Sequence, residues 1–598
     1  MCGRLTGRVI DLNKMQDGFN AFIKKLSFAD YLLVLAVFFL FVFYAVYLCS
    51  YAQLPSPVFG GDYYRDRGFV KNIVAGNPFW SDGFYANEIQ YYPYLVFLVQ
   101  ACFVKLTGAN LDKVFLLFPL LTLVLSSVVW YLLGSRLFKD KKWGLTASLY
   151  FLFFVYSINP KSSSVALFLL VPCFLYFWLR YEQEGKTKSV VYAAVLLGLT
   201  GLTWGGVFLG ISATFALVLL YNFISDSVKE KAFARTLTSY FKKYYLIFII
   251  TVLISMLFFV PLFAKYGFNS VNKVTEWGDT RIELLGPIWV LKIFRNMFFD
   301  YQKLYMLPLT LVSLIGLFAL IFAKKTREMR FILLIFVANI IIIQHHLLTR
   351  PLLNFSFLPE KLVYLAYLSP LFFAFGAKFI SQQLNNEHYK KILFAAVIIL
   401  LLITFFFKFN DFKNGQWQQV GFGDNTYISA LYRLGDYIEN TAGKNETILS
   451  NDESGFMLAV LSGRKVVLTR RTHANYYVDI DERIAEAAVA LYGRNASLAR
   501  EILGKYNVRY LYLDSNLLQY SMRTRPEFKD YLIEHNINFT EAYDRYDIAV
   551  PADKANLRNL LIIPPQEISR GFLELWEPVY SVDVAGQAVG QLLRLKSE

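Results

Sequence analysis

Residues 29–50, ADYLLVLAVFFLFVFYAVYLCS, are followed after a short link by residues 60–67, GGDYYRDR. The first stretch is almost entirely apolar over about 20 residues, the length that a helix needs to cross a hydrocarbon core about 30 Å thick. The second stretch places acids, arginines and tyrosines where the chain leaves the membrane. Together the two stretches predict a membrane protein with a polar working surface at one face of the bilayer.

The composition is typical of a multi-span membrane protein. Of 598 residues, 56% are hydrophobic and 18% are aromatic, values too apolar for an ordinary soluble protein. The first apolar stretch is too long for a cleavable signal peptide, so we expect it to be retained as a helix. The net charge of +15 lies largely in short loops between apolar stretches, where Lys and Arg set orientation. We therefore expect no nucleic-acid partner.

Apolar stretches recur along the chain and predict eleven spans. They are residues 29–50, 112–134, 143–158, 163–180, 189–205, 206–224, 244–263, 304–323, 330–344, 361–380 and 390–409. Residues 91–107 could also span. However, the basic N-terminal segment 1–28 and the basic loop 135–142 can both be cytoplasmic only if an even number of crossings separates them. We therefore expect residues 91–107 to lie along the interface as a juxtamembrane helix.

The same charge pattern predicts the orientation of the chain in the cell (plasma) membrane. The N-terminus and the basic loops are expected on the cytoplasmic side, whereas the external segment 51–111 and everything after residue 410 are expected outside. The predicted fold class is a polytopic α-helical membrane domain, residues 29–410, followed by a soluble extracytoplasmic domain, residues 424–598.

This C-terminal domain is predicted to be α/β, because amphipathic stretches alternate with short β-rich runs. The amphipathic stretches are residues 429–439, 480–492 and 497–506, and the β-rich runs are residues 447–450, 465–469 and 509–513.

Polar candidates for a functional site gather on the predicted external side. Carboxylates at a membrane face can act as a general base or hold a divalent cation. Arginines suit capture of a phosphate, and aromatic rings offer stacking faces for a sugar. In the first external segment these candidates include Asp62, Tyr63, Tyr64, Asp66, Arg67, Asp82 and Glu88, and later segments add Glu276, Arg350 and Lys361. Such groups suit an enzyme that transfers the polar head of a lipid-phosphate substrate.

Simpler interpretations compete for several of these residues. Tyr and Trp in an external loop often serve as interfacial anchors. The pair His345-His346 suits an amphipathic helix end better than a metal site. Asp62 differs, because Gly60 and Gly61 precede it and allow backbone geometry that places a carboxylate into a site. We therefore take Asp62 as the leading catalytic candidate.

Several motifs resemble those of a known family. GGDYYRDRGFVKNIVAGNPFWSD at 60–82, followed by YYPYLVFLVQACFVKLTG at 91–108, resembles the first external loop of GT-C superfamily glycosyltransferases. The likeness is to the catalytic subunits of oligosaccharyltransferases, which carry an Asp–aromatic–Arg pattern there. LGLTGLTWGG at 197–206 resembles their Trp-Gly-Gly-bearing helix, and residues 273–276 stand where they have a Ser/Thr-x-Glu-type motif. The tail from Glu446 resembles the start of their external domain.

Two departures separate the chain from oligosaccharyltransferases. The next external loop, 157–164, contains Lys161 where that family has a second acidic motif. Residues 451–455, NDESG, stand where that family has the Trp-Trp-Asp-Tyr-Gly motif that recognises an acceptor sequon. The first departure leaves only Asp62 and Glu276 as candidate ligands for Mg²⁺ or Mn²⁺, which prefer about six oxygens. We therefore expect transfer that survives chelation, with Lys161 assisting the phosphate. The alternative is that Lys161 is an ordinary surface lysine of a solvated loop.

The resemblance implies an integral-membrane glycosyltransferase that moves a sugar from a polyprenyl- or dolichyl-phosphate-linked donor to an extracytoplasmic glycan or protein acceptor. The predicted catalytic residues are Asp62 and Asp66, the predicted phosphate ligands are Arg67, Arg350 and Lys361, and the predicted acceptor contacts are Tyr63, Tyr64, Asp82, Glu88 and Glu276. Three alternatives remain: an oligosaccharyltransferase acting on Asn, a non-catalytic subunit of a glycosylation complex, and a lipid or solute transporter. The scarcity of charged residues within the spans argues against a transporter.

Overall fold

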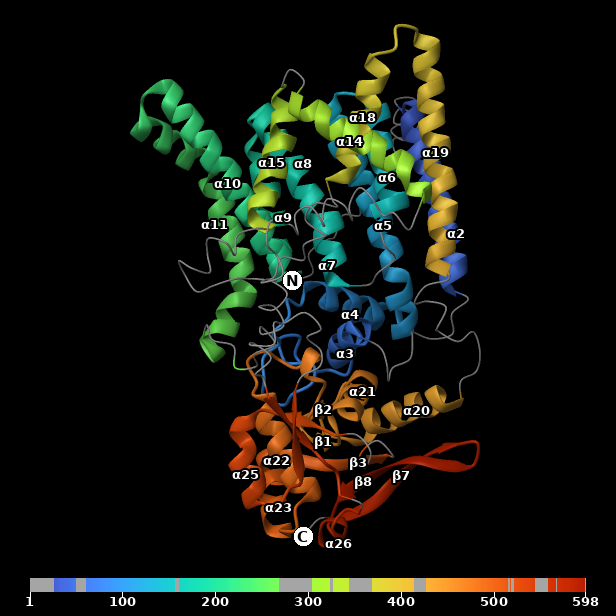
Figure 1. The fold of residues 1–598 in the computed structure, drawn as a ribbon, viewed down its shortest axis with the longest axis vertical. Helices are drawn as coiled ribbons and strands as arrows, with labels where there is room; N and C mark the ends of the chain where they lie inside the picture. Colours follow the sequence, from blue (N-terminus) through green and yellow to red (C-terminus); the bar gives the residue numbers. More distant parts are fainter. Residues whose placement is uncertain are drawn as a thin grey trace, which may run out of the picture.

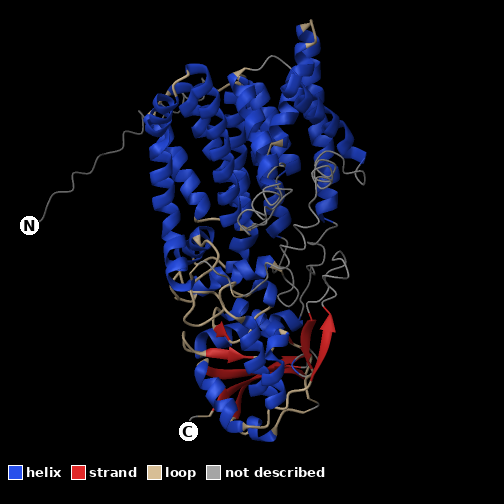
Figure 2. Cartoon of the chain, turned by 60° about the vertical axis from the view of Figure 1, so that its left-hand side comes forward, coloured by secondary structure: helices blue, strands red, loops and turns tan. Residues whose placement is uncertain are grey.

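Helices form one end of the molecule and all described strands lie at the other (Figures 1 and 2). The structure is a computed structural model. It describes residues 26–49, 61–155, 161–267, 271, 304–322, 326–343, 368–413, 426–514, 517, 521–543, 558–565 and 567–596. The helical end is a bundle of apolar helices, and the other end is an α/β domain built from the C-terminal part of the chain.

Each predicted span overlaps a helix or a run of helical segments. The bundle comprises α2 (Phe28–Cys49), α5 (Leu111–Phe138), α6 (Lys141–Tyr150) with η1 (Phe151–Val155), α7 (Ser162–Val165) with η2 (Ala166–Leu170) and α8 (Val171–Glu184), α9 (Thr187–Gly201), α10 (Gly205–Glu230), α11 (Phe233–Tyr266), α14 (Leu307–Phe322), α15 (Arg327–Ile343), α18 (Ser369–Gln382) and α19 (Glu387–Lys413).

Within the described residues, six helices are long and apolar enough to cross a membrane by themselves, or seven if α14 and α15 form one bent span. These two helices meet at an angle of 109°. The existence of helices at the predicted positions is thus confirmed, whereas the count of eleven crossings stays a prediction.

The basic loops gather at the end of the bundle opposite the α/β domain (Figure 1). Ion pairs join several helices at that end. Lys141 pairs with Asp30 of α2 at 2.6 Å, and Lys139 pairs with Glu328 of α15 at 3.0 Å. Basic helix ends from different parts of the described chain therefore meet at this end of the bundle, and the predicted alternation of crossings stays a prediction. The compartment that each end faces stays a prediction.

Residues 91–107, expected at the interface, contribute the helix α4 (Leu95–Thr107). It has 13 residues, which at 1.5 Å per residue give about 20 Å, too short for a hydrocarbon core. Together with α3 (Asp62–Val74), it lies between the bundle and the α/β domain (Figure 1). The first external segment therefore forms a layer on which the C-terminal domain rests.

Small residues allow the closest helix contact in this part of the bundle. A Cβ added at Gly316 of α14 would lie 1.9 Å from the carbonyl oxygen of Phe372, and one added at Gly376 of α18 would lie 2.0 Å from that of Val312. Backbones can approach this closely only where side chains are absent, which is a common packing device between apolar helices. Larger residues at either position would force α14 and α18 apart.

The C-terminal domain is α/β, as its pattern predicts. The five-stranded sheet has the order β2-β1-β3-β8-β7, with β1 parallel to β2 and β3, and β8 antiparallel to both its neighbours. A three-stranded antiparallel sheet has the order β4-β6-β5. The strands are β1 (Thr447–Leu449), β2 (Lys465–Val466), β3 (Val508–Asp514), β4 (Arg523–Thr524), β5 (Phe539–Tyr543), β6 (Arg558–Ile562), β7 (Trp576–Val584) and β8 (Gln587–Leu595).

The predicted helices and strands of this domain are confirmed. The amphipathic stretches form α20 (Thr426–Thr441), α22 (Ile480–Tyr492) and α23 (Ala496–Lys505), and the β-rich runs form β1, β2 and β3. One further helix, α21 (Asp452–Ser462), follows β1 directly. It packs against α3, where Gly68 has no side chain and leaves room for Val460 of α21. A Cβ added at Gly68 would lie 3.2 Å from the Val460 side chain.

Candidate active site

Asp62 is the first residue of α3, at the layer between the bundle and the C-terminal domain. The partial positive charge of a helix N-terminus stabilises a carboxylate there. Gly61, which precedes it, has a φ of −88°, and an added Cβ would meet nothing within 4 Å. The placement of Asp62 therefore comes from the start of the helix, and Gly61 itself has no steric need to be glycine.

Two cationic side chains hold the Asp62 carboxylate. The Lys161 Nζ atom lies 2.5 Å from Oδ2, and an Arg65 guanidinium nitrogen donates to Oδ1 at 3.1 Å. The ring nitrogen Nε2 of His473 lies 3.5 Å from the same Oδ1. Burial alone would favour the neutral acid, but His473, Arg65 and Lys161 together hold the pKa of Asp62 well below its usual value. Asp62 is therefore ionised at neutral pH.

The Asp62 side chain remains reachable, with 39% of its surface exposed, and that of Lys161 is 28% exposed. Lys161 begins the short helix α7, at the end of the bundle that faces the C-terminal domain. The sequence interpretation of Lys161 as a possible phosphate partner, or as a mere surface lysine, did not foresee its contact with Asp62. Its ammonium group is therefore bound to Asp62 and also partly exposed.

Arg65 and Asp66 form a buried pair beside this site. Arg65 Nε and one terminal nitrogen donate to Oδ1 of Asp66 at 2.9 and 2.7 Å, and both side chains are at most 3% exposed. Oδ2 of Asp66 is buried and accepts no hydrogen bond from the residues that the structure describes. Burial raises the pKa of Asp66, although Arg65 opposes the shift. Asp66 therefore orients Arg65, and its predicted direct catalytic role stays a prediction.

Aromatic side chains line one flank of the pair. Arg65 also donates to the Tyr92 hydroxyl at 3.0 Å, and that hydroxyl lies 3.3 Å from the hydroxyl of Tyr476 in the C-terminal domain. The ring of Trp204, from the Trp-Gly-Gly motif, lies 5.3 Å from the Tyr92 ring. The motif residue is thus brought to the same site as α3, which its position in the sequence alone could not indicate. Such rings suit contact with a sugar.

His473 is a site residue that the sequence interpretation missed. It ends the turn η5 (Arg471–His473) and stacks on Phe456 of α21, with ring centroids 4.9 Å apart. The Tyr91 hydroxyl donates to its backbone carbonyl at 2.8 Å. Burial lowers the pKa of His473, and Asp62 opposes that shift. A single histidine in a loop carries no sequence signal, because only the fold brings it to Asp62.

Other predicted site residues on α3 serve packing. Arg67, predicted to bind phosphate, instead pairs with Asp112 of α5 at 2.5 Å and donates to the Val460 carbonyl at 2.6 Å. Its side chain is 5% exposed. Tyr64 is fully buried. Tyr63 lies nearer the site, with its ring centroid 5.8 Å from the Lys161 ammonium. The structure gives Arg67 and Tyr64 structural roles, and their predicted ligand contacts stay predictions.

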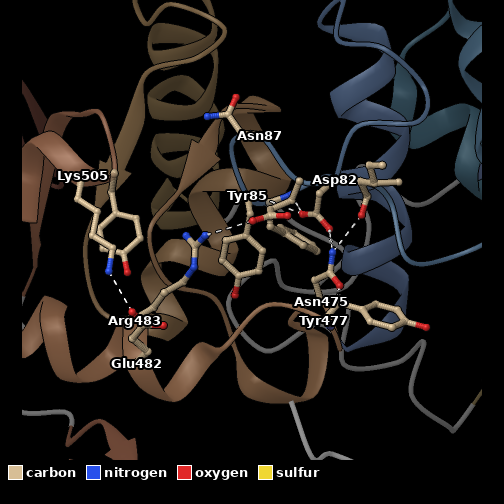
Figure 3. A network of polar contacts seen from close by, with 12 residues as sticks. Asp82, Tyr85, Asn87, Asn475, Tyr477, Glu482, Arg483 and Lys505 are labelled. Atoms are coloured by element: carbon tan, nitrogen blue, oxygen red, sulfur yellow. Dashed lines mark hydrogen bonds and ion pairs between the residues drawn. The ribbon is translucent and has the colours of Figure 1, made fainter. Parts of the chain in front are cut away.

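Asp82 belongs to a network that joins the first external segment to the C-terminal domain (Figure 3), and Glu88 joins this network through Arg483. Oδ1 of Asp82 accepts from the amides of Phe84 and Tyr85 at 2.7 and 2.8 Å, and Oδ2 accepts from Asn475 at 3.0 Å. Asp82 is fully buried, and burial raises its pKa despite these hydrogen bonds. These hydrogen bonds all stay within the described part of the protein, so the structure supports a scaffolding role for Asp82.

Glu88 accepts from the Tyr266 hydroxyl at 2.7 Å and pairs with Lys265 at 2.9 Å, both at the end of α11. Its other oxygen lies 3.8 Å from Arg483, whose guanidinium covers the Tyr85 ring at 4.5 Å. This network fixes the first external segment against both α11 and the C-terminal domain. The predicted acceptor contacts of Asp82 and Glu88 stay predictions.

Three predicted site residues, Glu276, Arg350 and Lys361, lie outside the described residues, as does the His345-His346 pair. Within the part of the chain that the structure describes, no group of three His, Cys, Asp or Glu side chains could hold a metal ion. Asp62 is already neutralised by Lys161 and Arg65, so these residues do not fit a divalent cation. Their chemistry instead suits an anionic group that would approach the exposed face of Lys161.

The comparisons with known proteins bear on fold and family. No protein-family model matches the chain. Over 94 residues the chain is 34% identical to an uncharacterised protein of Methanocaldococcus jannaschii, a match that covers 16% of this chain and 69% of that protein.

Two solved structures share the fold over nearly the whole chain. The oligosaccharyltransferase of Archaeoglobus fulgidus in the apo form is 13% identical, with a TM-score of 0.52, and the match covers 94% of this chain and 80% of that one. A mycobacterial arabinofuranosyltransferase is 13% identical, with a TM-score of 0.50, and the match covers 96% of this chain but 40% of that one. The resemblance to GT-C proteins, expected from the motifs, is thereby confirmed at the level of the fold. The chain therefore has the fold of GT-C membrane glycosyltransferases and belongs to the same family as the uncharacterised M. jannaschii protein.

Proposed function

We propose that the protein is an integral-membrane glycosyltransferase that moves a sugar from a polyprenyl- or dolichyl-phosphate donor to an acceptor on the extracytoplasmic side. The observation that carries this proposal is the Asp62 carboxylate at the N-terminus of α3, paired with Lys161 at 2.5 Å. The pair lies between an apolar bundle, which can accommodate a lipid chain, and a C-terminal domain that can present an acceptor. The GT-C fold supports the same reaction class.

The roles follow from charge. In the transfer, the acceptor oxygen forms a bond to the anomeric carbon of the sugar and releases its proton to water. The bond from that carbon to the phosphate oxygen breaks, and its electron pair stays on the phosphate. The lipid phosphate leaves with one more negative charge, which a fixed ammonium and guanidinium stabilise. Lys161 and Arg65 are placed to do this. The low pKa of Asp62 makes it a weak base, so its better role is to accept a hydrogen bond from the acceptor hydroxyl and orient it.

The fold is shared with an oligosaccharyltransferase, which keeps that activity as a second candidate. The residues in place of the Trp-Trp-Asp-Tyr-Gly motif argue against it. Asn451 caps α21 by accepting from the Ser454 amide at 2.7 Å, and the Ser454 hydroxyl donates to Asp514 at 2.7 Å. Gly455 packs so tightly that an added Cβ would lie 2.2 Å from the Leu468 carbonyl oxygen. These contacts hold the domain together and leave no tryptophan surface for a sequon.

The test is a transfer assay on purified full-length protein in detergent, with labelled polyprenyl-phosphate monosaccharides and, separately, a lipid-linked oligosaccharide with a sequon peptide. We expect label to leave the monosaccharide donor. In Asp62→Asn the rate should fall by about 10²- to 10⁴-fold, the usual contribution of a positioned catalytic group. Glu439→Gln is a matched control, because it removes a carboxylate that pairs at 2.6 Å with Lys71 of α3, the helix that Asp62 begins.

Other results of this assay would indicate a different function or a different catalytic residue. Transfer only to the sequon peptide would assign oligosaccharyltransferase activity. Near-normal turnover in Asp62→Asn would refute its role. Absence of transfer from every donor, with lipid transport or complex formation instead, would favour the transporter or the non-catalytic subunit.

A further inference from the structure

A polar cavity lies between α8, α10, α11 and α15. Its charged lining residues come from the ends of these helices that lie opposite the C-terminal domain (Figure 1), and thus far from Asp62. Its volume is about 240 Å³. Its inner wall is apolar and includes Trp178, Phe331 and Leu334, whereas its polar wall carries charged side chains from all four helices. An apolar wall beside a charged one suits a ligand with a polar head and an apolar body.

One of the two acids in the cavity is fully engaged. Glu182 of α8 pairs with Lys243 of α11 at 2.8 Å and with Arg327 of α15 at 3.0 Å, and its other oxygen accepts from the Tyr244 hydroxyl. These contacts join three helices at one carboxylate. Glu182 therefore has no free acceptor capacity that a cationic ligand would need.

The second acid, Asp226 of α10, accepts from the Tyr240 hydroxyl at 2.7 Å. Arg330 of α15 lines the same cavity, and its guanidinium lies 5.5 Å from the Tyr221 ring centroid. Within the described chain, no carboxylate lies within ion-pair distance of Arg330. With Lys243 and Arg327, it gives the cavity three cations against two acids. An anion is the ligand that this excess charge attracts.

The surrounding surface indicates where such an anion comes from. The hairpin of α10 and α11 beside the cavity exposes large apolar side chains, among them Val228 (70%), Phe233 (65%) and Phe241 (71%). The same hairpin carries Lys229 and Arg235. A helix surface that mixes lysine and arginine with exposed apolar residues is typical of the headgroup layer of a membrane. The anion that meets such a surface most often is a lipid phosphate.

We propose that this cavity binds the phosphate group of an anionic phospholipid, with Arg330 as its principal ligand and the apolar wall against the glycerol and first methylenes. A guanidinium offers two parallel donors to phosphate oxygens, which a lysine cannot match. Bound there, the lipid links α10 and α15 through a ligand rather than through direct ion pairs. The site is independent of the sugar transfer and does not rest on it.

Native mass spectrometry of the full-length protein, delipidated and then titrated with phosphatidylglycerol or phosphatidylcholine, tests this site. We expect retention of phosphatidylglycerol, and at least a tenfold weaker retention in Arg330→Gln with an intermediate loss in Arg330→Lys. Arg235→Gln, which removes an exposed cation at the same membrane end, is the matched control and should bind as the parent does. Monodisperse elution and the unchanged Arg235→Gln result separate loss of the ligand from misfolding.

Three results would overturn the proposal. Equal retention of both lipids would show that the cavity does not distinguish an anionic headgroup from a zwitterionic one. Undiminished phosphatidylglycerol binding in a folded Arg330→Gln would place the lipid elsewhere. Inorganic phosphate or glycerol phosphate that displaces the lipid at equal concentration would make this a site for a soluble phosphate instead.

Discussion

Replacing Lys161 by Met tests whether the Asp62 pair acts on a phosphate. The change keeps the length of the side chain and removes its charge. Two unit charges about 4 Å apart interact by about 4 kcal/mol at the effective dielectric of a protein surface. Since both side chains are partly exposed, at 28% and 39%, solvent screening reduces this to about 1–2 kcal/mol. A transition state that places a new phosphate charge beside Lys161 loses at least as much.

The expected result is a fall of about 5- to 30-fold in kcat/KM for the polyprenyl-phosphate donor, since about 1.4 kcal/mol is a factor of ten. Lys71→Met is the control. Lys71 lies on α3, the helix that Asp62 begins, and makes an equivalent ion pair with Glu439 of α20 at 2.6 Å, away from Asp62. Initial rates at several donor concentrations separate kcat from KM. A change below threefold in Lys161→Met, or an equal loss in Lys71→Met, would refute the reasoning.

Three further predictions concern metal, positioning and pH. Transfer should continue in excess EDTA, because Lys161 already neutralises Asp62; complete loss that Mg²⁺ or Mn²⁺ restores would contradict this. His473→Ala should lower kcat about tenfold with little change in donor KM, and His473→Gln, which keeps a donor, should recover part of it; equal loss of kcat in both variants would indicate a purely structural role. Burial lowers the pKa of Lys465 to about 8. Between about pH 8 and 10 the folded protein therefore binds fewer protons than the unfolded chain. The unfolding temperature of the C-terminal domain should consequently rise with pH across this window. Lys465→Met should remove that slope, and a slope that persists would assign it to another group.

The helices of both domains could be predicted from the sequence because their signals are local. Apolar stretches of membrane length, and amphipathic stretches such as residues 480–492, encode a helix within a few consecutive turns. The interfacial placement of residues 91–107 needed one more step. The basic segments 1–28 and 135–142 can both be cytoplasmic only if an even number of membrane crossings separates them. The structure shows a helix of 13 residues in this segment, and its placement at the interface stays a prediction. Outside the described residues, as at 272–303, the number of crossings rests on the sequence alone.

The site was only half predictable, because its partners come from distant segments. The sequence identified Asp62 but assigned Arg67 to phosphate, since an external arginine beside an acid suits that task. The fold instead pairs Arg67 with Asp112, 45 positions away, and turns Arg65 toward the site. His473 reaches Asp62 from a different domain. No property of the residues around His473 signals this contact.

The lysine at position 161 has a consequence for the donor that follows from charge alone. Exchanging an acid for Lys161 changes the local charge by two units, the same change that one bound divalent cation would make. Arg65 and Lys161 balance Asp62 and Asp66 when both acids are ionised. Because burial raises the pKa of Asp66, a protonated Asp66 would leave one net positive charge. A sugar phosphodiester carries one negative charge, whereas a pyrophosphate carries more. We therefore expect a monophosphate-linked donor and transfer without a metal, because a pyrophosphate donor would leave negative charge that these residues cannot neutralise.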